Sequence, residues 1–328
     1  MKTLRISATF ASALSLLAGA AQAETVWTMA SGYPESSFLT QNIRAFIEAV
    51  EERTEGELKI DLRSHDTLIK LDNIKRAVQS GQVQIGEIRM GVYGNEQEMF
   101  NLDNIPGVVP TFEKSWMLME EQKPFYDEWF GRGGMEVLSY IAWPGQGFYT
   151  EGEISGLADL EDLKLRIYSR QTQVMGEKLG AEAIILPFAE VPQAFATGMI
   201  EALWTSAQSG TDVQAWDYLD TFTYTGTMHN KNAVIVNQRA MRALPEDIQA
   251  IVREEGEKAT ERGWEIARAA GEEREQVLRD HGMTVTQAPQ EVLDRIDQIG
   301  KEMVADWLEV ASEEEAAVYE AYQARITD

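Results

Sequence analysis

The segment from Lys164 to Thr205, "KLRIYSRQTQVMGEKLGAEAIILPFAEVPQAFATGMIEALWT", decides the fold class of this chain. Short apolar runs alternate in it with stretches of helical periodicity, and each predicted helix ends at a glycine. The pattern predicts strands at 164–168, 183–186 and 201–205 and helices at 171–179 and 189–197. Alternating β and α elements of this length are typical of an α/β lobe with a largely parallel sheet.

The same alternation occurs nearer the amino terminus. It predicts strands at 25–30, 58–63 and 83–90, separated by helices at 37–54 and at about 70–80. The two units share no repeated sequence. Because the roughly 305 residues after the first 23 exceed the size of a usual single core, we expect two lobes.

A long helix is predicted after the strand Ala233–Asn237. Its segment, 244–282, carries Pro245 and acidic residues near the start and Gly282 at the end. A helix of about 35 residues is roughly 50 Å long, which exceeds the width of one small lobe. We therefore predict an α/β fold of two lobes with this helix spanning both. The predicted boundaries are 24–143 with 231–270 for lobe I and 144–230 with 271–328 for lobe II.

The first 23 residues have the pattern of a cleaved secretory signal. Lys2 and Arg5 precede an apolar run, Ile6–Ala18, and small residues end at Ala23. The apolar run is shorter than the roughly 20 residues that a membrane span needs, and we expect no membrane insertion. The chain contains no cysteine, which excludes disulfides and a lipid-anchored cysteine. We therefore expect an exported protein located in a periplasm.

The chain is strongly acidic, with a formal net charge of −25 at pH 7. Nucleic acids and anionic membrane surfaces are poor partners for such a chain. We expect most of these acidic residues to lie on a solvated surface, whether or not that surface is an adaptation to high salt. An anionic ligand would have to rely on local cations within about 10 Å, the Debye length at moderate salt.

Ligands of open α/β sheets collect beyond the carboxyl ends of the strands. Each lobe offers an arginine and aromatic residues there. The residues at the predicted strand ends are Gly32, Tyr33, His65, Asp66, Glu87, Arg89, Met90, Arg166, Tyr168, Ser169, Pro187, Phe188, Trp204, Thr205 and Ser206.

Arg166 is a candidate for holding an anion, because a guanidinium donates two parallel hydrogen bonds to a carboxylate or sulfonate. Its alternative role is an ion pair with a nearby acid: Asp159, Glu161 or Glu190. Arg89 is a weaker candidate, since Glu87 lies on the same strand face and could neutralise it. Trp143 and Trp204 lie at predicted strand ends, where they could be core residues or walls of a ligand cleft.

Motifs of catalysis are missing from the sequence. It contains no G-x-S-x-G, H-E-x-x-H, P-loop or G-x-G-x-x-G pattern. The histidines at 65, 229 and 281 lie far apart and lack metal-ligand spacing. We therefore expect a protein that is not an enzyme and that uses neither a cofactor nor a metal ion.

The segment from Leu157 to Leu203 resembles the signature region of the DctP-type solute-binding proteins of TRAP (tripartite ATP-independent periplasmic) transporters. Further similar segments are "FIEAVEERTEGELKIDLR", "IKRAVQSGQVQIG", "NIPGVVPTFEKSWMLM" and "ALPEDIQAIVRE". The resemblance implies a two-lobed fold like that of periplasmic binding proteins, which closes on its ligand by hinge bending. It also implies that Arg166 pairs with the ligand carboxylate.

The chain departs from the family pattern at two places. Gln146 lies near the position of a frequent second arginine. Thr205 occupies the position of a usual asparagine, and Trp204 occupies the neighbouring position. These departures favour a monocarboxylate with an aromatic or otherwise apolar body over a dicarboxylate. The predicted ligand-binding residues are Arg166, Arg89, Trp204, Thr205, Gln146, Trp143 and Tyr168.

The resemblance implies a periplasmic receptor that captures an organic acid and delivers it to the permease subunits of a TRAP transporter. Two alternatives stay open at this point. One is a binding protein of an ABC transporter for a sulfonate or an amino acid, and the other is a periplasmic enzyme.

Overall fold

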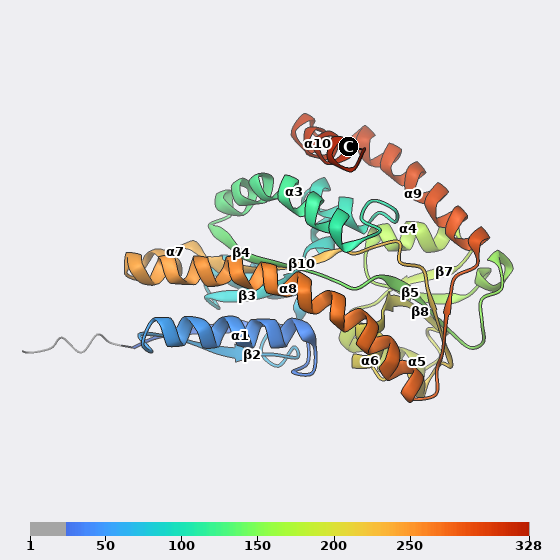
Figure 1. Ribbon diagram of the computed structural model, residues 1–328, viewed down its shortest axis with the longest axis horizontal. Coiled ribbons are helices and arrows are strands. Elements are labelled where there is room, and N and C mark those ends of the chain that lie inside the picture. Colours follow the sequence, from blue (N-terminus) through green and yellow to red (C-terminus); the bar gives the residue numbers. More distant parts are fainter. Residues whose placement is uncertain (1–23, 328) are drawn as a thin grey trace, which may run out of the picture.

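A computed structural model describes residues 24–327 and contains two β-sheets, each covered by helices (Figure 1). The predicted signal segment, residues 1–23, lies outside the described residues. The first sheet has the strand order β2-β1-β3-β10-β4. Its strands are β1 (Thr25–Ala30), β2 (Leu58–Arg63), β3 (Ile85–Arg89), β4 (Met135–Ala142) and β10 (Lys231–Asn237).

The second sheet has the strand order β11-β9-β5-β8-β6-β7. Its strands are β5 (Gln146–Thr150), β6 (Lys164–Ile167), β7 (Glu182–Ile185), β8 (Ala202–Ser206), β9 (Thr221–Tyr224) and β11 (Thr284–Gln287). The three strands predicted from the segment 164–205 are β6, β7 and β8, and β6 pairs in parallel with the other two.

Both sheets are mixed, which corrects the expectation of largely parallel sheets. The chain passes from one sheet to the other between β4 and β5 and returns between β9 and β10. As a result β10 runs antiparallel to β3 and β4, and β5 runs antiparallel to β8 and β9. The sequence did not reveal β5, because all five of its residues are buried and show no alternation of apolar and polar side chains.

The predicted long helix is confirmed as α8 (Glu246–Asp280). It contacts β4 and α1 beside the first sheet, and α6 and β11 beside the second, so it spans both lobes (Figure 1). The other helices are α1 (Phe38–Arg53), α2 (Ile74–Ser80), α3 (Phe112–Arg132), α4 (Arg170–Lys178), α5 (Val191–Ala196), α6 (Ala207–Asp212), α7 (Gln238–Arg242), α9 (Gln290–Val310) and α10 (Glu313–Thr327).

The carboxyl-terminal helix α10 packs against α3, which lies beside the first sheet. Tyr322 of α10 is fully buried and donates a hydrogen bond to the backbone oxygen of Val108, while Arg325 pairs with Glu120. The end of the chain therefore contacts the first lobe, although the predicted boundaries place 271–328 in the second. The exact boundaries of the lobes stay a prediction.

One hydrophobic core extends through both lobes. It includes Ile88 and Phe100 near the first sheet and Phe148 and Leu165 from the second. Two smaller cores lie apart from it, one beneath α1 and the other around β8 and β9. In the part of the chain from 24 to 327, no helix combines the length and the apolar character needed to cross a bilayer.

Candidate functional site

A small cavity lies where strand ends of the two sheets meet. Its lining comes from both lobes, because Arg89 ends β3 of the first sheet and Arg166 lies in β6 of the second. The lining residues are Tyr33, Arg89, Trp143, Gln146, Arg166, Tyr168, Phe188, Thr205, Ser209 and Asn230.

Arg166 reaches the cavity from a buried strand. Its side chain is only 2% exposed, and its Nε and Nη2 atoms donate to the backbone oxygen of Leu186 at 3.1 and 2.8 Å. Among the described residues, Nη1 donates no hydrogen bond, and no carboxylate forms a salt bridge with Arg166. Arg166 therefore does not form the ion pair with Asp159, Glu161 or Glu190 that was the alternative drawn from the sequence. The guanidinium is anchored along one edge and leaves a second edge for an anion.

Arg89 also carries a charge that is incompletely balanced. Its Nη2 atom lies 3.4 Å from Oδ1 of Asp72, and its Nε atom is buried without a hydrogen-bond partner among the described residues. Glu87 does not neutralise it, contrary to the alternative drawn from the sequence. The Glu87 carboxylate instead accepts hydrogen bonds from Ser31 at 2.5 Å and from Asn232 at 2.9 Å.

The two guanidinium groups lie over one aromatic ring, that of Tyr168. Their central carbons are 5.4 Å (Arg89) and 5.7 Å (Arg166) from its centroid. Burial, and secondly the charge of Arg89, lower the pKa of Arg166 to about 9. Arg166 is still protonated at neutral pH. Because charges removed from water are costly unless they are paired, this cavity favours an anion.

Aromatic side chains form part of the cavity wall. The ring of Tyr33 meets Trp143 edge-on, with 5.2 Å between centroids, and lies 5.9 Å from Phe188. The indole Nε1 of Trp143 donates to Oδ1 of Asn232 at 2.9 Å, which fixes the ring. Such a wall suits a small ligand body with an apolar face.

The polar side chains of the cavity are largely bonded to one another. The Tyr168 hydroxyl donates to Oε1 of Gln146 at 3.3 Å and accepts from Nδ2 of Asn230 at 3.4 Å. Nε2 of Gln146 donates to the backbone oxygen of Pro144 at 3.0 Å. Within residues 24–327 no group of three or more His, Cys, Asp or Glu side chains is placed to hold a metal ion.

Six of the seven predicted residues line this cavity: Arg166, Arg89, Thr205, Gln146, Trp143 and Tyr168. Trp204 does not. Its indole is fully buried and packs against Phe148, with 4.6 Å between the ring centroids. Side chains alternate along β8, so Trp204 faces the core while Thr205 faces the cavity. This placement corrects the expectation that Trp204 forms a wall of the site.

Four lining residues were not among the predicted set. Tyr33 and Phe188 follow β1 and β7, and the rule of strand ends did name them, although neither was chosen as a ligand-binding residue. Ser209 lies in α6 and Asn230 in the connection between β9 and β10. The sequence pattern held no signal for these two, because the cavity position of each depends on how the two sheets are brought together.

The chain matches the family model DctP, described as "Bacterial extracellular solute-binding protein, family 7", over residues 29–310. The crystal structure of DctP7 from Bordetella pertussis, an extracytoplasmic solute receptor binding pyroglutamic acid, is 36% identical, with a TM-score of 0.89 over 91% of this chain and 99% of that chain. A TRAP solute-binding protein from a marine metagenome, specific for pyroglutamate, is 28% identical, with a TM-score of 0.88 over 92% and 99%.

A solute-binding protein of Sulfitobacter sp. strain NAS-14.1 is 23% identical over 269 residues, which are 81% of this chain and 82% of that protein. The family model covers most of the chain, and the similarity to DctP7 extends over nearly the whole of both proteins. The fold, with two sheets and a helix spanning both, agrees with these relatives. The chain therefore belongs to the DctP family of bacterial extracellular solute-binding proteins.

Proposed function

We propose that this protein is the periplasmic receptor of a TRAP transporter for a small cyclic monocarboxylate, and that pyroglutamate is its ligand. The observation that carries the proposal is the buried guanidinium of Arg166, which is held by a backbone oxygen and has no carboxylate partner among the described residues. A ligand carboxylate would supply the missing negative charge through paired hydrogen bonds.

The surroundings of Arg166 favour a ligand with one carboxylate. Arg89 already has Asp72 at 3.4 Å, and Gln146 is uncharged. The aromatic wall of Tyr33, Trp143 and Phe188 suits a flat ring. Two relatives, 36% and 28% identical to this chain, bind pyroglutamate, which combines one carboxylate with a five-membered ring.

Capture would take place by closure of the lobes around the ligand. Side chains from both sheets line the cavity, so opening of the lobes would separate Arg89 from Arg166. The connections between the sheets and α8 would act as the hinge. The closed receptor would then dock on the membrane permease and release the acid there, after export of the protein through the signal segment.

Two other functions have less support. The family consists of solute-binding receptors, and we propose that this member performs no catalysis. A receptor of an ABC transporter is disfavoured, because the relatives of known structure include TRAP receptors.

The test is to identify the ligand that copurifies with the protein and to measure its affinity. Native mass spectrometry followed by denaturation should release pyroglutamate, and calorimetry on the refolded, ligand-free protein should give one site per chain. A released sulfonate or neutral solute would overturn the carboxylate assignment. Binding of carboxylates other than pyroglutamate would leave the receptor function in place and change its ligand.

A further inference from the structure

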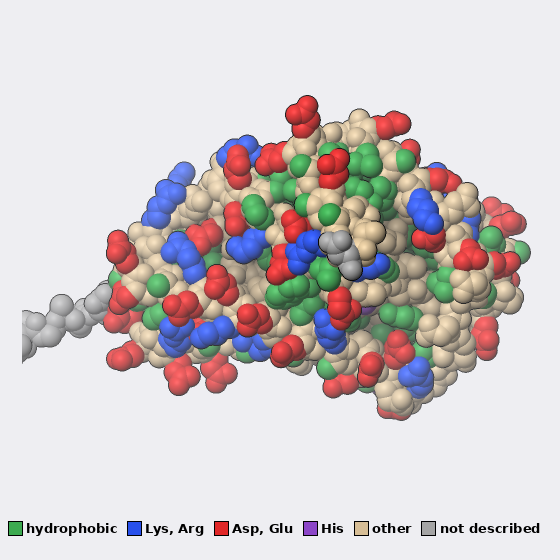
Figure 2. Space-filling model, turned by 45° about the horizontal axis from the view of Figure 1, so that its top comes forward, with side chains coloured by type: hydrophobic (Ala, Val, Ile, Leu, Met, Phe, Trp, Pro, Cys, Tyr) green, Lys and Arg blue, Asp and Glu red, His purple; other side chains and the backbone are tan. Residues whose placement is uncertain are grey.

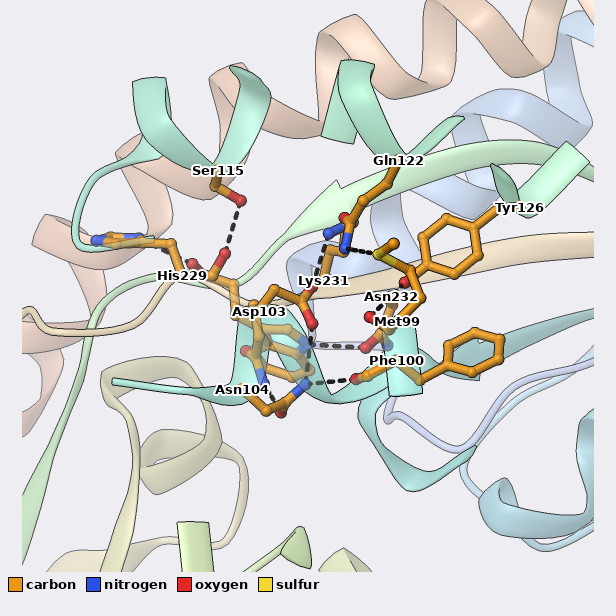
Figure 3. A network of polar contacts seen from close by, with 12 residues as sticks. Met99, Phe100, Asp103, Asn104, Ser115, Gln122, Tyr126, His229, Lys231 and Asn232 are labelled. Carbon is orange, nitrogen blue, oxygen red and sulfur yellow. Dashed lines mark hydrogen bonds and ion pairs between the residues drawn. The ribbon is translucent and has the colours of Figure 1, made fainter. Parts of the chain in front are cut away.

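A buried ion pair lies behind the ligand cavity. Nζ of Lys231 is 2.7 Å from Oδ2 of Asp103, and the two side chains are 0% and 1% exposed (Figure 3). Lys231 begins β10, directly after the connection that returns from the second sheet. An ammonium group only donates hydrogen bonds and a carboxylate only accepts them, so this pair has a fixed polarity.

The polarity of the pair orients the amide of Asn104. Oδ1 of Asp103 accepts from Nδ2 of Asn104 at 3.0 Å, and the same nitrogen lies 3.3 Å from the backbone oxygen of Phe100 (Figure 3). Since both of these neighbours are acceptors, the nitrogen of the Asn104 amide must face them. Its oxygen then faces the opposite way, toward Asn230.

The orientation of the Asn104 amide in turn fixes the orientation of the Asn230 amide, and Asn230 lines the cavity. Nδ2 of Asn230 donates to Oδ1 of Asn104 at 2.9 Å and to the hydroxyl of Tyr168 at 3.4 Å. These two bonds use both hydrogens of the amide. Among the described residues, Oδ1 of Asn230 accepts no hydrogen bond. Asn230 is 3% exposed and lines the cavity, so it offers the cavity an acceptor without a partner among the described residues and no free donor.

We infer that Asn230 recognises a hydrogen-bond donor on the ligand, and that Asp103, Lys231 and Asn104 are positioning residues that turn its oxygen toward the cavity. This inference rests on the proposed function, because it assigns the second polar group of the acid that Arg166 holds. The lactam N–H of pyroglutamate is such a donor. The matching γ-lactone, 5-oxotetrahydrofuran-2-carboxylate, places a ring oxygen there and would leave two acceptors facing each other.

The first test compares these two acids on the wild-type protein, made ligand-free by unfolding and refolding. Calorimetry should show pyroglutamate binding at least about tenfold more tightly than the lactone, because a buried acceptor without a donor is costly. Equal affinities would overturn the inference while leaving the proposed function standing. Failure of the protein to bind either acid would overturn both the proposed ligand and the inference.

The second test uses three variants and the same affinity ratio. Asn230→Leu removes the acceptor, and Asn104→Ala frees the Asn230 amide to rotate, so both should bring the ratio to within about threefold of unity. Asn101→Ala is the matched control, because Asn101 is a buried asparagine of the same segment that bonds to Gly94 and Glu98 instead. It should keep the wild-type ratio.

The ratio of the two affinities separates a positioning role from a merely structural one, because a general loosening of the fold weakens the binding of both acids alike. Retention of the preference by Asn230→Leu would overturn the assignment of the acceptor. If Asn104→Ala retained the preference for pyroglutamate while Asn230→Leu lost it, the positioning role of Asn104 would be overturned. Circular dichroism and thermal melting establish whether each variant is folded. If a variant does not fold, the comparison of the two acids on the wild-type protein still decides whether the site recognises a donor.

Discussion

At the scale of single residues, Arg166 combines a buried charge with the absence of a carboxylate partner among the described residues. We expect Arg166→Met to weaken binding of the ligand carboxylate by about 2–5 kcal/mol, since a buried charged contact is lost. The free energy of unfolding of the ligand-free protein should fall much less, because the substitution also removes an unbalanced buried charge. Calorimetry and urea unfolding measure the two quantities.

Arg170→Met is the control for this substitution. Arg170 begins α4, is exposed and bonds only to Gln173 among the described residues. Its loss should leave the affinity unchanged. Full affinity in Arg166→Met for every acid tested would show that the guanidinium does not hold the ligand.

Glu87 gives a prediction about pH. Burial raises the pKa of its carboxyl from 4.5 to about 7, against the opposing effect of the hydrogen bonds from Ser31 and Asn232. Between these pH values the folded state binds more protons at this site than the unfolded state, so the stabilisation is lost as the pH rises through 7. The contribution lost between pH 5 and pH 8 is about 2–3 kcal/mol.

Glu87→Gln removes this titration. Urea unfolding at pH 5, 6.5 and 8 should show the variant gaining stability relative to the wild type as the pH rises. Groups that the two proteins share, such as Asp212, whose pKa burial raises to about 6, cancel in the difference. A difference that is constant from pH 5 to pH 8 would contradict the raised pKa.

At the scale of elements, α8 depends on a close approach to β4. A Cβ atom at Gly256 would lie 2.4 Å from the backbone oxygen of Leu138, and a backbone atom cannot move aside cheaply. We expect Gly256→Ala to lower the free energy of unfolding by about 1–3 kcal/mol, although alanine favours the helical state.

Gly271→Ala on the same helix is the matched control. The nearest atom to its added Cβ would be Cβ of Pro144 at 3.5 Å, an ordinary contact. This substitution should raise stability by up to about 1 kcal/mol, the helix propensity difference between the two residues. Equal effects of the two substitutions in urea unfolding would mean that α8 does not pack as tightly on β4 as the distances indicate.

At the scale of the whole molecule, the net charge of −25 opposes the approach of an anionic ligand. Acidic side chains are spread over the face in Figure 2 and are not gathered in one patch. Salt screens this field beyond about 8 Å at physiological strength, while the buried cations of the cavity act at shorter range.

We therefore expect the association rate of the ligand to rise at least about twofold between 0.02 and 0.5 M NaCl, the reverse of electrostatic steering. Stopped-flow tryptophan fluorescence measures the rate, with Trp143 in the cavity wall as a reporter. The dissociation rate should change less, since the contact with Arg166 is buried. An association rate that falls with salt would mean that the arginines dominate the approach.

The sequence by itself determined the α/β class, the two lobes and the long helix α8, and it selected Arg166, which lines the cavity. These features depend on local periodicity, helix-end signals and a resemblance in a continuous segment, all of which are readable along the chain. The alternation of side chains along β8 was also readable, and applying it would have separated Trp204 from Thr205.

Only the tertiary structure decided the mixed strand order, the pairing of Arg89 with Asp72 and the place of Asn230 at the cavity. Asn230 takes its orientation from Asn104, which is 126 residues away in the chain. Contacts of this kind form because the chain crosses three times between the sheets, and no local pattern encodes which distant side chains such a crossing brings together.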